Sequence, residues 1–174
     1  MRPSVAPAVA GLRGGRHERP GPIERVDRCA PRATIYYELI SHRRTQTPAA
    51  EARATGVDPG HVAKTLVLAT EDGFVRAVLS ASDRIDLRKV KAILGRDDVH
   101  LASEQMLAGR YPEFELGAVP PVGGPGQDLV LMDERLRDAE SVVFEAGTHE
   151  HSVRIKTADL VSVAGARIAD ICED

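Results

Sequence analysis

Lys64 is the clearest candidate for chemistry because it lies within a run of strand-forming residues, His61–Ala69. In a strand, Lys64 shares a face with Val62 and Leu66. If that face is buried, an ammonium sits among apolar groups, which is costly without a partner and is typical of a functional lysine. If the face is exposed, the lysine stem lies along the sheet surface. Alternation alone does not choose between the faces, so the sequence leaves both interpretations open.

A second candidate is the segment 117–126, which contains four glycines and three prolines. No regular element is expected at that density of Gly and Pro. Prolines fix φ, and glycines let the backbone approach a ligand closely, so the segment could form a wall of a binding site. An ordinary connecting loop is the alternative.

Histidines and cysteines offer weaker signals. His149 and His151 lie on one side of a predicted strand and could ligate zinc, but two histidines do not complete a site. Cys29 lies in an irregular tail and Cys172 near a chain end, so neither is expected to be a nucleophile. The sequence also lacks a Gly-x-Ser-x-Gly elbow, a P-loop and a dinucleotide fingerprint, which argues against the corresponding enzyme classes.

The remaining polar and loop residues suggest a site without a protein nucleophile. Lys64, His42, the 117–126 segment, Asp133 and Gly147 could bind an ester and position water or a substrate hydroxyl. Lys64 and the loop amides would stabilise developing negative charge.

The elements that must position these residues follow from periodicity and caps. Asp72-Gly73 between two apolar runs predicts a hairpin, and an apolar stripe of Ile35, Tyr36, Leu39 and Ile40 predicts a short helix. Further helices are expected at 48–55 (N-cap Thr47, stop at Gly56), 87–94 (stop at Gly95), 103–107 and 158–163 (N-cap Thr157). Further strands are expected at 99–102, 128–133, 141–146, 151–156 and 166–171, with a turn or short helix at 134–138. Six or seven strands with interspersed short helices indicate an α+β fold.

Composition predicts one folded domain, 33–174, after an Arg/Pro/Gly-rich tail, 1–32, that is expected to be disordered. The tail has an excess of four positive charges and the remainder carries −7, so a broad phosphate-binding surface is not expected. Aromatic residues make up 3% and tryptophan is absent, which disfavours stacking platforms for single-stranded nucleic acid. Two cysteines imply no disulfide framework and favour a reducing cytoplasm, and no apolar run approaches a membrane span.

The order of the motifs resembles a known family. The motifs are, in chain order, His42, Thr47-Pro48-Ala49-Ala50-Glu51-Ala52, Lys64-Thr65-Leu66-Val67-Leu68, Asp86-Leu87-Arg88-Lys89-Val90 with Leu94-Gly95, the Gly-x-x-Pro-Pro-x-Gly run at 117–123, Asp133, and Ala146–Ile155. Each is weak alone, but their order and spacing are specific together. From Ile35 to Ile171 the chain resembles the YbaK/prolyl-tRNA synthetase-associated domain family of trans-editing aminoacyl-tRNA deacylases; the tail lies outside the resemblance.

The resemblance implies a single compact α+β domain, with a mixed, mostly antiparallel sheet of about seven strands curled around a pocket and short helices outside. It implies hydrolysis of the ester of mischarged tRNA without a metal, a cofactor or a protein nucleophile. Lys64 matches the family's pocket lysine and is the expected catalytic residue. The expected substrate-binding residues are His42, Thr47, Gly117, Pro120, Pro121, Gly123, Asp133 and Gly147.

Three functional hypotheses follow. The first is trans-editing of tRNA that carries a small amino acid (Ala, Ser, Cys or Pro), where pocket shape discriminates only modestly between side chains. The second is a non-catalytic module that holds an aminoacyl end or small ligand for a synthetase. The third is a zinc hydrolase that uses His149 and His151. The first is favoured, with tRNA and an aminoacyl-tRNA synthetase as expected partners and no membrane involved.

Overall fold

The β3–β4 hairpin forms the centre of the fold in this computed structural model, which describes residues 21–24, 34–44, 47–124 and 128–174. Strand β3 is Ala63–Thr70 and strand β4 is Gly73–Ser80, so Glu71 and Asp72 form the two-residue loop between them. Gly73 has a φ of 140°, which favours glycine at this position. The predicted hairpin is therefore confirmed.

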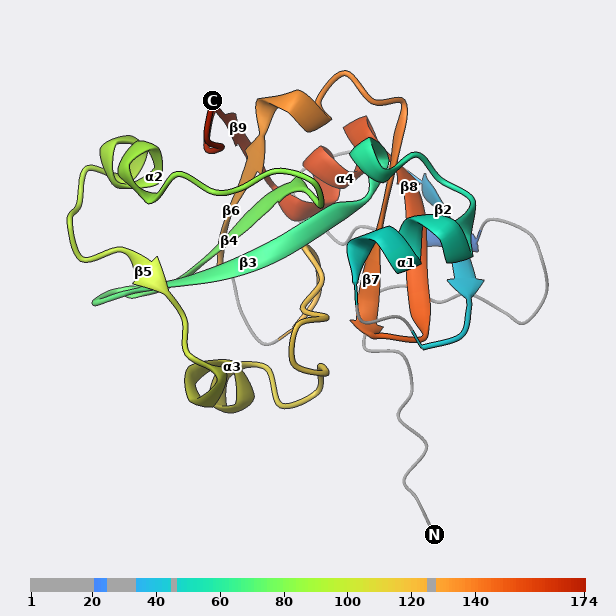
Figure 1. Ribbon diagram of the computed structural model, residues 1–174, viewed down its shortest axis with the longest axis horizontal. Coiled ribbons are helices and arrows are strands. Elements are labelled where there is room, and N and C mark those ends of the chain that lie inside the picture. Colours follow the sequence, from blue (N-terminus) through green and yellow to red (C-terminus); the bar gives the residue numbers. More distant parts are fainter. Residues whose placement is uncertain (1–20, 25–33, 45–46, 125–127) are drawn as a thin grey trace, which may run out of the picture.

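Nine strands form two sheets within the described residues (Figure 1). The five-stranded sheet has the order β5-β3-β4-β6-β9, with β4–β6 and β6–β9 parallel, and the four-stranded sheet is antiparallel with the order β1-β2-β8-β7. The other strands are β1 (Gly21–Glu24), β2 (Thr34–Ser41), β5 (His100–Leu101), β6 (Leu129–Asp133), β7 (Ser141–Thr148), β8 (His151–Lys156) and β9 (Arg167–Ala169). A parallel bridge between Val62 and Val143 joins the sheets. The α+β class is confirmed, with the strands divided between two sheets where one curled sheet was expected.

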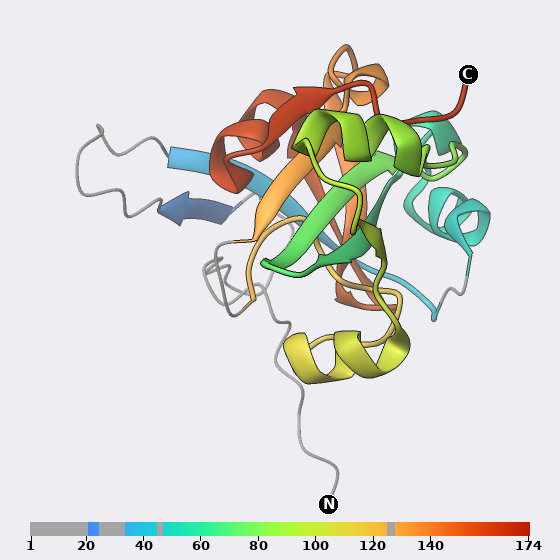
Figure 2. The same ribbon diagram turned by 90° about the vertical axis from the view of Figure 1, so that its left-hand side faces the viewer.

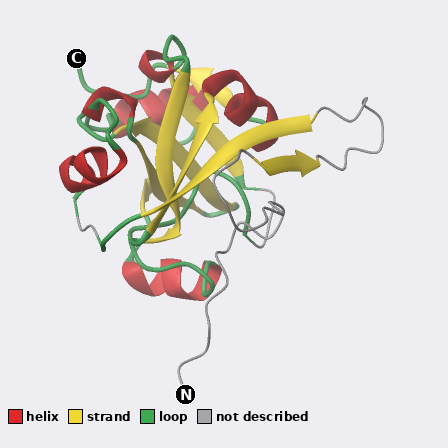
Figure 3. Ribbon diagram, turned by 90° about the vertical axis from the view of Figure 1, so that its right-hand side faces the viewer, coloured by secondary structure: helices red, strands yellow, loops and turns green. Residues whose placement is uncertain are grey.

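Short helices cover the outside of the strands (Figure 3). They are α1 (Pro48–Thr55), α2 (Leu87–Leu94), α3 (Glu104–Arg110) and α4 (Thr157–Ala164), with 3-10 turns η1 (Pro59–His61) and η2 (Glu134–Leu136). The Thr47 hydroxyl caps α1 by accepting a bond from the Ala50 amide, and Gly56 and Gly95 end α1 and α2 in left-handed conformations. These stops are where the sequence predicted them.

Three local predictions are wrong. The segment around Ile35 is the strand β2 and not a helix; Ile35 and Tyr37 are buried while Tyr36 is 58% exposed, which is the period of a strand. Thr157 is the first residue of α4 and Lys156 occupies the cap position. Gly21–Glu24, within the tail expected to be disordered, pair with β2 (Figure 2); the rest of 1–32 lies outside the described residues.

The apolar core fills the space between the sheets and extends over both faces of the five-stranded sheet. One cluster joins residues of β2, β4, β6, β7, β8 and α4, including Tyr37, Met132 and Phe144. A second, around Leu79 and Val90, packs α2 on the outer face of β4. A third cluster packs Val67 of β3 against Tyr111, Phe114 and Val119, which follow α3 in the chain.

Candidate active site

A cavity of about 580 Å³ lies between β3, α1, β7 and the segment 116–119. The sheets meet here, because Val62 bridges to Val143 where β3 begins. Apolar side chains form much of the wall, and the polar groups belong to a small set. The lining residues are Arg44, Thr47, Glu51, Val62, Ala63, Lys64, Thr65, Leu66, Val67, Leu101, Ala102, Leu107, Leu116, Gly117, Val119, Phe144, Glu145 and His149.

Lys64 lines this cavity and is half-buried, which settles the question its alternation left open. Its Nζ donates to the carbonyl oxygens of Ala81 at 3.2 Å and Asp83 at 2.6 Å. Burial lowers the pKa of Lys64, and the neighbouring Cys172 and Asp83 oppose that shift. An ammonium carries three N–H donors, of which these two bonds use two.

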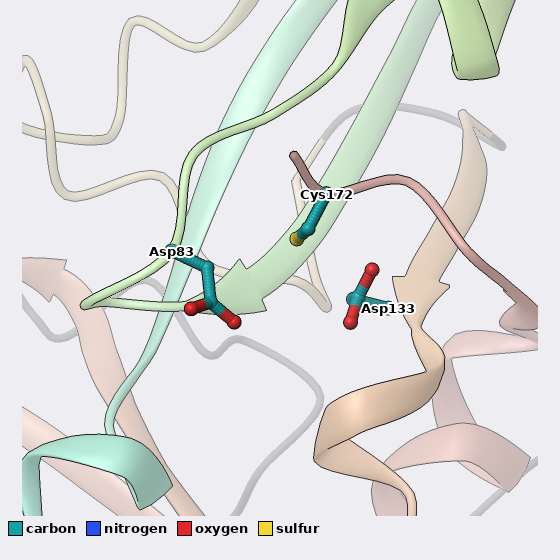
Figure 4. A group of neighbouring side chains, drawn as sticks. All are labelled: Asp83, Asp133 and Cys172. Atoms are coloured by element: carbon teal, nitrogen blue, oxygen red, sulfur yellow. The ribbon is translucent and has the colours of Figure 1, made fainter. Parts of the chain in front are cut away.

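Asp133 does not line the cavity, in contrast to its expected role as a pocket residue. It is fully buried, and its carboxylate accepts the amides of Arg135 and Ile171, each at 3.0 Å. Figure 4 shows Asp133 facing Asp83 and Cys172, and the ligand atoms of the three residues lie within 4.8 Å of one another. Cys172 in turn neighbours Lys64, so Asp133 belongs to the support of the lysine and not to the cavity wall.

The Asp83–Asp133–Cys172 cluster is better explained by charge balance than by a metal ion. Burial, together with Asp133, raises the pKa of the Cys172 thiol to about 12, so the sulfur keeps its proton. Both Asp133 oxygens are occupied by backbone amides. Lys64 and Arg135, whose Nη1 lies 3.7 Å from Asp83 Oδ2, supply the positive charge.

Two carboxylates that the sequence did not single out lie in the wall. Glu51 of α1 is 4% exposed, and its Oε1 accepts the Ser152 hydroxyl at 2.7 Å. Burial raises the pKa of Glu51 to about 7, even though the Ser152 bond favours the charged form. Burial also raises the pKa of Glu145 on β7. Glu145 follows Phe144 and precedes Ala146 in the sequence, and the fold brings its carboxylate close to Glu51.

His149 occupies the turn between β7 and β8 and faces Glu145. Its Nε2 donates to the Leu116 carbonyl at 2.9 Å, and its Nδ1 lies 2.8 Å from Glu145 Oε1. Burial alone would lower the pKa of His149, but the bond and charge of Glu145 raise it above its ordinary value. His151 instead pairs with Thr148, and neither histidine joins a group of three metal donors among the described residues. The zinc hypothesis therefore gains no support.

The Gly/Pro segment lines the cavity through its first residues, Gly117 and Val119. Gly117 lines the cavity with a φ of 86°, and a Cβ added there would lie 3.5 Å from the His149 ring. Pro120 and Pro121 are buried and do not line the cavity. The carbonyl oxygens of Pro120 and Gly123 accept Arg76 Nη1 and Nη2 at 2.9 and 2.7 Å, so these residues anchor the segment.

The other expected site residues divide between the wall and the layer behind it. Thr47 lines the cavity and also caps α1. Gly147, with a φ of 92°, lies behind the wall, where its carbonyl accepts the Glu115 amide at 2.9 Å. His42 also lies outside the lining set, and its Nε2 is 2.9 Å from Ser152 Oγ. The structure thus brings Lys64, Thr47 and Gly117 to the cavity and places the other expected residues around it.

Comparisons with known proteins agree with this arrangement. The family model of the aminoacyl-tRNA editing domain matches residues 42–163, a span that contains every lining residue. A solved structure described as a "putative trans-editing enzyme for prolyl tRNA synthetase" has 27% identity and a TM-score of 0.74, covering 79% of this chain and 87% of that one. Another, of a hypothetical protein, has 25% identity and a TM-score of 0.73, covering 79% and 91%.

Proline–tRNA ligases are similar in sequence to part of this chain. The ligase of Streptococcus pneumoniae serotype 4 is 27% identical over 117 residues, which covers 64% of this chain and 19% of the ligase. The ligase of S. pneumoniae strain Hungary19A-6 is 30% identical over 117 residues, again 64% of this chain and 19% of the ligase. The chain therefore spans about one fifth of the length of these relatives. No helix within the described residues is long and apolar enough to cross a membrane.

Proposed function

The chain belongs to the aminoacyl-tRNA editing domain family, which confirms the resemblance found in its sequence, and we propose that it hydrolyses the ester of mischarged tRNA. The proposed substrate carries a small amino acid such as Ala, Ser, Cys or Pro. The observation that carries this proposal is the cavity within the matched span, with Lys64 on one wall and the Gly117 backbone on another. Its volume is in the range of ligand sites.

The proposed mechanism is positioning and electrostatic stabilisation. The aminoacyl ester is an activated bond, and the terminal ribose supplies a neighbouring hydroxyl. Holding the ester, that hydroxyl and a water in reactive geometry accounts for much of the required acceleration. Lys64 and the backbone near Gly117 would stabilise the oxyanion, and Thr47 would contact the substrate. We assign Asp133 to the support of Lys64, and Pro120, Pro121, Gly123 and Gly147 to the support of the wall.

No protein nucleophile is required in this scheme, and the side chains that could serve as one are poorly placed. Cys172 is fully buried and its thiol pKa is raised to about 12. Ser152 is also fully buried and does not line the cavity. Selectivity would come from the apolar part of the wall around Val62, Val67 and Phe144, where one methylene is worth about 1–3 kcal/mol.

A panel of mischarged tRNAs tests the proposal. We expect at least one small aminoacyl ester to be hydrolysed well above the buffer rate, and Lys64→Met to lower kcat/KM at least tenfold. Lys156→Met is the matched control, because Lys156 is an exposed strand lysine outside the lining set. Buffer-rate hydrolysis of every ester would refute the proposal, and equal rates for wild type and Lys64→Met would refute the role of Lys64.

The ligase relatives favour one alternative, a binding module that holds an aminoacyl end for a synthetase. These relatives contain a comparable segment within a much longer chain. The alternative predicts saturable binding of aminoacyl-tRNA without turnover, together with co-purification of a synthetase. Prompt turnover by the isolated protein would make it unnecessary. In both cases we propose tRNA and a synthetase as partners and the cytoplasm, where tRNA is charged, as the location.

A further inference from the structure

Three polar side chains form a hydrogen-bonded relay that leads away from the cavity. Glu51 of α1 lines the cavity, Ser152 of β8 lies behind it, and His42 follows β2 on the far side of the serine. Ser152 Oγ lies 2.7 Å from Glu51 Oε1 and 2.9 Å from His42 Nε2. Ser152 is fully buried, whereas His42 is half-buried beside the exposed Arg43. The relay therefore connects the cavity with the protein surface.

The contact between His42 and Arg43, at the outer end of this relay, limits which atoms of the relay can carry hydrogens. His42 Nδ1 lies 2.9 Å from the Arg43 carbonyl, which can only accept, so Nδ1 carries a hydrogen. A serine hydroxyl has one hydrogen to give. If Ser152 donates to Glu51, its oxygen can still accept a hydrogen bond from His42 Nε2, and Glu51 can remain a carboxylate. If Ser152 donates to His42, Glu51 must be protonated to complete the second bond.

We propose that Glu51 is the general base of this site and that Ser152 and His42 are positioning residues that orient its carboxylate and keep it ionised. This inference rests on the proposed ester hydrolysis. Glu51 takes one proton from the attacking water as the water oxygen bonds to the ester carbonyl carbon. The tetrahedral intermediate then breaks the bond to the ribose oxygen, which takes up the proton from Glu51. Water and ester are consumed, acid and alcohol form, and Glu51 returns to its carboxylate.

The groups facing Glu51 allow this role. Glu145 approaches from β7, His149 from the β7–β8 turn, Ser152 from β8 and His42 from the segment after β2. The Ser152 hydrogen bond, together with His42 and His149, favours the Glu51 carboxylate, whereas the neighbouring Glu145 disfavours it. Burial opposes it, and the resulting pKa of about 7 suits a base at neutral pH.

Glu51→Gln is the first test, since the amide can still accept the Ser152 hydroxyl. We expect kcat/KM to fall about 100-fold at pH 8. We also expect the wild-type rise in rate through pH 7 to disappear, after subtraction of the buffer rate. Glu38→Gln is the matched control, because Glu38 is an exposed glutamate on β2 that pairs with Arg154. It should keep the wild-type rate and pH profile.

His42→Asn and Ser152→Ala test the Ser152–His42 part of the relay separately from the base. Both remove a contribution that lowers the pKa of Glu51, so the rise in rate should move to higher pH, with wild-type rates recovered near pH 9. Loss of structure would not give such recovery, and His42→Asn changes only a half-buried side chain, so it remains usable if Ser152→Ala folds poorly.

The outcomes separate the two proposals. Full activity of Glu51→Gln, or an unmoved pH profile in a folded His42→Asn, would overturn the base and its relay while leaving ester hydrolysis intact. An inactive wild-type protein across the whole tRNA panel would overturn the proposed hydrolysis, and the general base with it.

Discussion

Arg76→Met is expected to unfold the wall of the cavity and destabilise the whole domain. Arg76 lies on β4, and its side chain is 3% exposed. Its guanidinium donates to the Pro120 and Gly123 carbonyls and to Asp128, so one side chain holds both sides of the Gly/Pro segment. Methionine has a similar length but donates nothing, and the substitution therefore removes the bonds while largely keeping the volume.

The expected loss of stability follows from the buried groups that Arg76→Met leaves without a hydrogen-bond donor. Removing one partner of a buried ion pair costs about 3–5 kcal/mol. Asp128 keeps Arg110 at 2.7 Å and the Tyr111 hydroxyl at 2.5 Å, which moderates the loss. The two carbonyl oxygens lose a charged donor, at about 1–3 kcal/mol for each that stays buried. We expect a total near 4 kcal/mol, equivalent to a fall in Tm of about 10 °C for a domain of this size.

Urea unfolding followed by far-ultraviolet circular dichroism measures the effect. Arg88→Met is the control, because the Arg88 side chain also pairs with an aspartate but is 91% exposed, and its loss should stay within about 0.5 kcal/mol. Arg76→Met combined with Asp128→Asn should cost less than the two single changes added together. A loss below about 1 kcal/mol for Arg76→Met, or strict additivity, would refute the view that this pair anchors the segment.

Three further predictions concern single residues. Gly117→Ala should cost about 1–2 kcal/mol in urea unfolding because its φ is 86°, and it should lower deacylation because the strained backbone lies in the cavity wall; unchanged stability and rate would contradict both. The folded-state pKa of Glu51 is raised from 4.5 to about 7, so the stability it contributes is present below pH 4.5 and lost as pH rises through 7. Glu51→Gln should therefore gain roughly 3 kcal/mol relative to wild type between pH 4 and pH 8, and a pH-independent difference would count against the shift. In a Cys29→Ser variant, Cys172 should react with a thiol reagent only after unfolding, because it is fully buried with a raised pKa; rapid reaction of the native protein would contradict its burial.

Elements with strong local signals could be predicted from the sequence. The hairpin was marked by Asp72-Gly73, α1 by the Thr47 cap and Gly56, and α2 by its apolar spacing and Gly95. In each case a glycine or cap residue satisfies backbone groups within a few residues of itself. Such signals do not depend on the rest of the fold.

Elements decided by distant partners were predicted less well. The residues around Ile35 are compatible with a helical stripe, but pairing with β8 imposes the strand period on them. The same pairing creates the edge to which Gly21–Glu24 bind. Thr157 looks like a cap, yet the chain turns one residue earlier, where β8 ends. Local propensity carried no information about these contacts.

The candidate site shows the same division. Lys64 and Gly117 were identifiable because a charge in an apolar strand and a dense Gly/Pro run are local anomalies. Glu51 and Glu145 were missed because neither is unusual in its own segment. Their raised pKa values arise from burial, which exists only after α1 packs on the four-stranded sheet. An isolated sequence window contains no measure of that desolvation.

The position of Lys64 follows from the same physical reasoning. A half-buried ammonium requires compensation, and it receives two carbonyl oxygens on one side, with Asp83 and Cys172 nearby. Asp133 is held by two backbone amides and bonds to Cys172, which neighbours Lys64, so its influence on the lysine is indirect. The carboxylates Glu51 and Glu145 are compensated separately, by Ser152 and His149. Lys64 and Glu51 therefore have their partners outside the cavity wall, whereas His149, the partner of Glu145, is itself part of that wall.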